Sequence, residues 1–215
     1  MSTITLYGPD FSYFLRVIRL LCQFKGVMHE TTLSPFGENV TPFGEEHGKL
    51  HPFRKIPVLM EGDFILPETP AIAHYLESKP GPSFFPEDIK LRSQVLATAE
   101  MFSLYVHQAI MADLVLEFAF PKGPDKTIRF DEINKRLPVA HEVMRWLSSL
   151  IYDEHFVADG RFSYCDAVLI PMLDYLEQLP APFNIITHYD NLMVYTLFHR
   201  QQYYAEGVLG EPNIG

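Results

Sequence analysis

The stretch of sequence that decides the fold reads Lys55-Ile56-Pro57-Val58-Leu59. Pro57 lies between a predicted loop and a predicted strand, a position that suits a cis peptide bond. A cis bond there would turn the backbone N–H and C=O of Ile56 outward, and an extended peptide could pair with them as an added strand. Taken alone, a trans proline that opens a strand is the alternative interpretation.

A second stretch, Leu66-Pro67-Glu68-Thr69, follows a short hairpin pattern. Thr69 followed by Pro70 predicts a helix start, with a hydroxyl N-cap and proline in the first helical position. The carboxylate of Glu68, the hydroxyl of Thr69 and the free N–H groups of the first turn suit the ammonium and carboxylate of an α-amino acid. Simple helix capping is the alternative for this stretch alone.

Around these stretches, residues 1–80 alternate strand and helix signals. Residues 3–7 are predicted to form a short strand, and the apolar spacing of residues 12–26 predicts an amphipathic helix that ends at a glycine C-cap. Residues 27–33 form a second predicted strand. Residues 34–54 are interrupted by prolines and glycines, so a mostly irregular loop is expected. The pattern predicts an α/β domain.

Residues 81–88, which lie in a proline- and glycine-rich break, are predicted to be a linker. Strand signals stop beyond it, and residues 89–215 are predicted to form an all-helical domain. A long helix is expected over residues 88–119, and shorter ones within residues 161–180 and 188–206.

The composition limits the function. Hydrophobic residues make up 47% of the chain and charged residues 20%, as in a globular protein with a buried core. The net charge of −10 argues against a nucleic-acid partner. The apolar runs are too short for a membrane span, and the start does not read as a signal peptide. With two cysteines and nine scattered histidines, the sequence predicts a reducing, cytoplasmic location and no metal site.

Together, the two stretches resemble the thioredoxin-like domain of glutathione transferases. The resemblance implies that Ile56, before a cis Pro57, pairs with the cysteinyl backbone of glutathione, while Glu68 and Thr69 hold its γ-glutamyl end. Lys55 matches a position that contacts the glycyl end. The contacts of the preceding loop are less defined, with His47 and Lys49 as candidates for the glycyl carboxylate, and with His51 where asparagine is common.

The start of the chain adds to the resemblance. Leu6-Tyr7-Gly8 is followed by Ser12, which opens the first predicted helix. In the family such a serine donates a hydrogen bond to the glutathione sulfur, and the helix N-terminus adds positive potential. Two alternatives stay open: Ser12 is an ordinary N-cap, or Tyr7 is the hydroxyl that activates the thiol. Cys22 and Cys165 are interpreted as inert core residues, which disfavours thiol-transfer chemistry.

In the second predicted domain, Phe162-Ser163-Tyr164-Cys165-Asp166-Ala167 resembles the family's capping box, a feature of folding rather than catalysis. An apolar acceptor is expected against Met101, Tyr105 and Gln108. The alternative is that this stripe is core or dimer contact. Phe53 matches an aromatic residue that inserts into the partner subunit in several classes, so a homodimer is expected. The alternative is that Phe53 packs on its own domain.

The resemblance implies an enzyme that conjugates the glutathione thiolate, with glutathione as co-substrate, to an electrophilic and largely apolar small molecule, a detoxification reaction. Two alternatives remain. One is another glutathione-dependent reaction on the same site, such as peroxide reduction or ether cleavage. The other is a non-catalytic binding module of the same fold.

Overall fold

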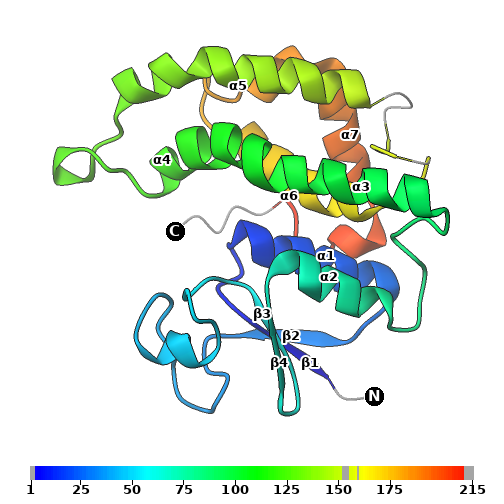
Figure 1. Cartoon of the computed structure of the whole chain (residues 1–215). Coiled ribbons are helices and arrows are strands. Elements are labelled where there is room, and N and C mark those ends of the chain that lie inside the picture. Colours follow the sequence, from blue (N-terminus) through cyan, green and yellow to red (C-terminus); the bar gives the residue numbers. More distant parts are fainter. Residues whose placement is uncertain (1–2, 152–154, 159, 211–215) are drawn as a thin grey trace. The chain divides into compact units, whose positions relative to one another are not determined.

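The computed structural model describes residues 3–151, 155–158 and 160–210, and it divides the chain into two compact units (Figure 1). The first unit is Met1–Phe84 with Tyr203–Val208, and the second is Phe85–Gln202 with Leu209–Gly215. The first holds a mixed sheet with helices and the second is helical. The predicted combination of a thioredoxin-like α/β domain and an all-helical domain is thereby confirmed.

The sheet of the first unit has four strands in the order β2-β1-β3-β4. Strands β1 and β2 run parallel, whereas β1 pairs antiparallel with β3, and β3 with β4. The elements are β1 (Ile4–Tyr7), α1 (Tyr13–Lys25), β2 (His29–Thr32), the short 3-10 helix η1 (Glu46–Lys49), β3 (Val58–Glu61), β4 (Phe64–Pro67) and α2 (Thr69–Glu77). The predicted hairpin is present, with its turn at Gly62 and Asp63.

Helix α1 lies between the two parallel strands in sequence and contacts α2, and both helices lie on one face of the sheet in Figure 1. Its apolar spacing places Leu15, Ile18 and Cys22 in the core. Gly26 ends the helix at φ +69°, in the left-handed conformation expected of a glycine C-cap. Residues 8–12 connect the end of β1 to the N-terminus of α1.

Residues 203–208 differ from the sequence expectation, which placed everything beyond residue 88 in the second domain. They pack on α1, where Arg19 donates to the carbonyl of Gly207 at 2.7 Å and Tyr203 donates to that of Phe24 at 3.0 Å. These are side-chain bonds to backbone across a large sequence separation, which local patterns do not reveal.

The second unit is built around α6. Its elements are α3 (Ile89–Met101), the π-helix η2 (Phe102–Val115), α4 (Leu116–Ala119), η3 (Pro124–Lys126), α5 (Phe130–Leu150), α6 (Tyr164–Glu177), η4 (Ile185–His188) and α7 (Asp190–Arg200), with η5 (Tyr203–Ala205) belonging to the first unit. Every residue of α6 from Tyr164 to Leu176 is buried. A helix that is buried on all sides forms the centre of its unit.

The long helix predicted over residues 88–119 is helical, but it is not uniform. Its middle portion, η2, has the hydrogen-bond pattern of a π-helix, in which backbone bonds join residues five apart rather than four. Within the described part of the chain, no helix combines the length and the apolar character needed to cross a membrane.

Candidate active site

Ser12 occupies the N-cap of α1 in extended conformation, with φ −68° and ψ 125°. Its carbonyl accepts the N–H of Arg16 at 2.9 Å, but its side chain makes no capping hydrogen bond. No acidic residue lies in the first turn of α1, so no carboxylate there offsets the positive end of the helix dipole. The half-buried hydroxyl is therefore left for a group outside the helix.

Tyr7, the rival hydroxyl, lies at the end of β1 and is fully buried. Its hydroxyl donates to the carbonyl of Val40 at 2.9 Å, and its ring packs edge-on against His47 with centroids 4.7 Å apart. Burial raises the pKa of the Tyr7 phenol. The Tyr7 hydroxyl therefore donates its proton to the loop that contains Val40, whereas the Ser12 hydroxyl makes no capping hydrogen bond.

The peptide bond between Ile56 and Pro57 is cis, as the sequence suggested. Pro57 is buried directly before β3, Ile56 is half-buried, and the Lys55 side chain is exposed. The carbonyl of Lys55 lies 3.0 Å from Nε2 of His47. Lys55, Ile56 and Pro57 therefore lead directly into β3.

His47 is fully buried, and both of its ring nitrogens are engaged inside the loop. Nδ1 accepts the N–H of Phe43 at 3.1 Å, so Nε2 carries the proton and donates to the carbonyl of Lys55. Burial lowers the pKa of His47, which favours this neutral form. The suggestion that His47 binds the glycyl carboxylate is wrong for this structure, because neither ring nitrogen is free. Lys49 is exposed and paired with Glu46.

Helix α2 begins at Thr69, so Glu68 rather than Thr69 is its N-cap. The expectation of a Thr69 N-cap is corrected by one residue. Glu68 has φ +74° and ψ 118°, a conformation that a residue with a side chain rarely adopts. Its side chain is 65% exposed, while Thr69 is buried. Backbone conformations of this kind cluster at ligand sites.

His51 is the site residue whose role the sequence did not reveal. It is buried, and its Nε2 lies 3.2 Å from Oε1 of Glu68. The sequence showed only a histidine in place of the common asparagine, and no local pattern relates it to a residue 17 positions further on.

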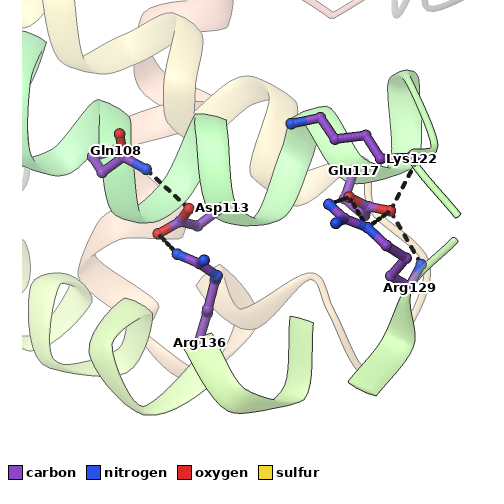
Figure 2. Close-up of polar contacts among 6 residues, drawn as sticks. All are labelled: Gln108, Asp113, Glu117, Lys122, Arg129 and Arg136. Carbon is purple, nitrogen blue, oxygen red and sulfur yellow. Dashed lines mark hydrogen bonds and ion pairs between the residues drawn. The ribbon is translucent and has the colours of Figure 1, made fainter. Parts of the chain in front are cut away.

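Met101, Tyr105 and Gln108 belong to the helical unit, and all three are exposed, Tyr105 at 68%. Their exposure removes the alternative that they are core. Gln108 donates to Oδ1 of Asp113 at 2.9 Å, five residues on, as the π-helical spacing allows (Figure 2). Asp113 in turn pairs with Arg136 of α5 at 2.7 Å. The expected stripe assumed α-helical spacing, which ends at Met101.

The two cysteines, Cys22 and Cys165, are both buried. Cys22 is buried in α1 and burial raises its pKa to about 12, and burial also raises the pKa of Cys165 in α6. A thiol with so high a pKa is protonated at neutral pH and is a poor nucleophile. The interpretation of both cysteines as inert core residues is confirmed.

The structure thus brings together the features on which the resemblance to glutathione transferases depends: Ser12 at the start of α1, the cis bond before Pro57, and Glu68 at the start of α2. Two family models match the chain: "Glutathione S-transferase, N-terminal domain" over residues 6–84 and "Glutathione S-transferase, C-terminal domain" over residues 96–196. Glutathione S-transferase F10 of Arabidopsis thaliana is 30% identical over 183 residues, which is 80% of each chain. The chain belongs to the glutathione S-transferase family.

Three further proteins are similar to this chain. The stringent starvation protein A homolog of Haemophilus ducreyi is 25% identical over 85% of this chain and 79% of its own length. Among solved structures, poplar glutathione transferase F1 has a TM-score of 0.81 at 21% identity and covers 97% of each chain. A glutathione S-transferase of Methylobacillus flagellatus KT, solved with glutathione bound, has a TM-score of 0.78 at 20% identity and covers 97% of this chain and all of its own.

Proposed function

We propose that this protein conjugates the thiolate of glutathione to an electrophilic, largely apolar small molecule, with Ser12 as the group that stabilises the thiolate. The observation that carries the proposal is the contrast between two hydroxyls. Ser12 makes no capping bond at the start of α1, while Tyr7 is buried and donates to Val40. Of these two hydroxyls, that of Ser12 is the one not engaged in a cap or a loop contact, which supports Ser12 as the donor to the ligand sulfur.

The magnitudes fit this role. A free thiol titrates near pH 8.5, so only a few per cent is thiolate at neutral pH. Lowering that pKa by about two units requires roughly 2.7 kcal/mol of preferential stabilisation of the anion. A hydrogen bond to a charged group contributes about 1.5–3 kcal/mol, and a helix N-terminus adds a few tenths to about 1 kcal/mol. One serine at the start of α1 is therefore sufficient.

The remaining predicted site residues would hold glutathione. Ile56, before Pro57, would pair with the cysteinyl backbone, and Lys55 would approach the glycyl end. Glu68 would bind the ammonium and Thr69, with the first turn of α2, the carboxylate of the γ-glutamyl end. The family relationship and the glutathione in the Methylobacillus flagellatus structure support this arrangement.

In the reaction, the thiol proton passes to solvent and the sulfur lone pair forms a carbon–sulfur bond to the acceptor. The displaced electrons leave with a leaving group or remain on the acceptor, which then takes up a proton. We propose Met101, Tyr105 and Gln108 as residues that meet the acceptor. We further propose a cytoplasmic homodimer in which Phe53, 77% exposed, contacts the partner subunit.

Ultraviolet titration of the enzyme-bound thiolate tests the proposal in wild type, Ser12→Ala, Ser12→Thr and Tyr7→Phe. Ser12→Ala should bind glutathione but titrate near the free thiol, with turnover falling in parallel. Ser12→Thr keeps the hydroxyl and should retain most of the shift. Tyr7→Phe should keep the shifted thiolate and lose only about 0.5–1.5 kcal/mol of stability, from its hydrogen bond to Val40.

Other outcomes separate the alternatives. If Tyr7→Phe loses the shifted thiolate and Ser12→Ala keeps it, the assignment of the catalytic hydroxyl is wrong. A shifted thiolate in wild type without transfer to aryl halides or epoxides, but with turnover of hydroperoxides, favours another glutathione-dependent reaction. Wild type without any shifted thiolate favours the binding module, an alternative kept because one relative is named a starvation protein rather than a transferase.

A further inference from the structure

We propose that His51 is a positioning residue for Glu68: its buried imidazole holds the Glu68 carboxylate in the orientation that receives the ammonium group of glutathione. This inference rests on the proposed function, because it assigns Glu68 to the ammonium. It concerns a contact between the loop before β3 and the start of α2, both within the first unit.

The orientation of the His51 ring is fixed from two sides. The residue is 2% exposed, and its backbone N–H donates to the carbonyl of His47 at 3.0 Å. Its Nδ1 accepts the backbone N–H of Phe53 at 3.1 Å. An imidazole whose Nδ1 accepts a hydrogen bond carries its proton on Nε2 when neutral. The Nε2–H group is therefore the one that His51 presents to Glu68.

Nε2 of His51 is buried and makes no hydrogen bond to any of the described residues. Its contact with Glu68 does not have the geometry of a hydrogen bond. Oε1 of Glu68 nevertheless lies 3.2 Å away. A buried N–H without a partner is unfavourable, so a small rotation of the Glu68 side chain that aligns the contact is favoured. The histidine thus draws one oxygen of the carboxylate toward the protein.

The geometry of Glu68 complements this. Its backbone is set at φ +74°, and its carbonyl accepts the N–H of Ile72 at 2.9 Å, so the direction of its Cβ is fixed by the start of α2. The side chain beyond Cβ is 65% exposed and would otherwise sample several rotamers. A hydrogen bond from His51 to Oε1 would leave the other oxygen for the ligand and would order the carboxylate before the ligand arrives. Such preorganisation lowers the entropy lost on binding.

The experiment compares two amides at position 51. In His51→Gln the amide nitrogen lies about where Nε2 was and can still donate to Glu68. In His51→Asn the amide lies near the position of Nδ1, where its oxygen can accept the N–H of Phe53, and no atom reaches Glu68. The pair separates the donor to Glu68 from the acceptor for the backbone. His74→Asn, an exposed histidine of α2, is the control.

Calorimetry would measure the affinity for glutathione and for its analogue without the α-amino group. We expect His51→Asn to weaken glutathione binding roughly 3- to 10-fold and to leave the analogue unaffected, while His51→Gln and His74→Asn stay near wild type. In the Glu68→Ala background, His51→Asn should cause no further loss. Turnover should show the change in KM for glutathione rather than in kcat.

Several outcomes would overturn the inference. Equal loss for both ligands in His51→Asn means that the histidine only supports the loop. Additive losses in the double variant mean that His51 and Glu68 act independently. Wild type that does not bind glutathione overturns the proposed function together with this inference, whereas wild type that binds while His51→Asn is unchanged overturns the inference alone.

A second measurement does not depend on the folding of a His51 variant. Nitrogen-15 spectra of the wild-type histidine rings should show His51 with its proton on Nε2. The Nε2 resonance should move in Glu68→Ala and on addition of glutathione, while that of His47 stays in place. An unmoved His51 resonance in both cases would contradict the contact.

Discussion

Helices α2 and α6 both have a carboxylate at their start, but the two carboxylates differ in burial and in hydrogen bonding. Asp166 in the first turn of α6 is fully buried and accepts from the N–H and hydroxyl of Ser163 at 2.8 and 2.7 Å, from the N–H of Val157 at 2.9 Å and from the hydroxyl of Tyr195 at 3.0 Å. Glu68 at the start of α2 is exposed, and its Oε1 lies 3.2 Å from Nε2 of His51.

This difference separates Asp166, a structural carboxylate, from Glu68, the carboxylate that we propose binds a ligand. Every donor around Asp166 is supplied by the unit itself, so the group holds the capping box, the α7 helix and the segment before α6 together. Glu68 has a fixed backbone, one inner contact and an outward-facing side chain. A buried polar group normally makes its hydrogen bonds within the fold. A polar group at the surface that lacks hydrogen bonds within the protein is available to bind a ligand.

The largest effect should come from Asp166→Ala. Its removal leaves the N–H groups of Ser163 and Val157 and the hydroxyl of Tyr195 without their acceptor in a buried environment. We expect a loss of about 3–5 kcal/mol in the free energy of unfolding, measured by urea denaturation. Tyr195→Phe, which removes one donor and leaves the carboxylate, should lose only about 0.5–1.5 kcal/mol. A loss below about 1 kcal/mol for Asp166→Ala would mean that the box does not hold the unit.

Glu68→Ala should show the reverse pattern. Removing a charged partner of a bound ammonium is expected to weaken glutathione binding by about 1.5–3 kcal/mol, or roughly 10- to 100-fold, in calorimetry. Stability should change little, because alanine and glutamate have the same Cβ at the positive φ. If this variant loses stability and keeps its affinity for glutathione, the contrast between the two residues is wrong, because Glu68 would then be a structural carboxylate like Asp166.

Sequence analysis predicted those elements whose signals are local. The Gly26 C-cap, the turn at Gly62 and Asp63, and the capping box of Ser163 and Asp166 each depend on residues within a few positions of one another. The predicted fold class also depends on local signals, because the alternation of strand and helix patterns is visible along the sequence.

The rest of the site depends on contacts that the irregular loop of residues 34–54 creates. Nothing in the sequence relates the Tyr7 hydroxyl to the carbonyl of Val40, or the His51 ring to Glu68, since the loop conformation is set by tertiary packing. His47 was therefore interpreted as a ligand contact, although it closes the loop through both nitrogens. The π-helical segment was missed for a similar reason, because its apolar residues fit an α-helix equally well.

A third carboxylate, Glu117 of α4, sharpens the comparison because its donors include a charged one. Glu117 is buried and accepts from Nε of Arg129 at 3.1 Å and from the backbone N–H groups of Lys122 and Arg129 at 3.2 and 3.1 Å (Figure 2). The hydrogen bond from the guanidinium lowers the pKa of Glu117 to about 2. The hydrogen bonds that Asp166 accepts come from neutral donors, and burial raises its pKa to about 6. His199, 4.0 Å from Asp166, has a pKa that burial lowers to about 3.

These opposite shifts give the smallest predicted effect, a difference in pH dependence. The folded pKa of Glu117 lies below its ordinary value of 4.5, so its contribution to stability is present above about pH 4.5 and is lost as the pH falls toward 2. For Asp166 the sign is reversed: stability is lost as the pH rises from 3.8 to about 6. Glu117→Gln cannot titrate and retains Asp166, so the difference between wild type and variant isolates Glu117. In urea unfolding, wild type should exceed Glu117→Gln at pH 6.5 by more than at pH 3. A constant difference across this range would show that the contact with Arg129 does not depend on the charge of Glu117.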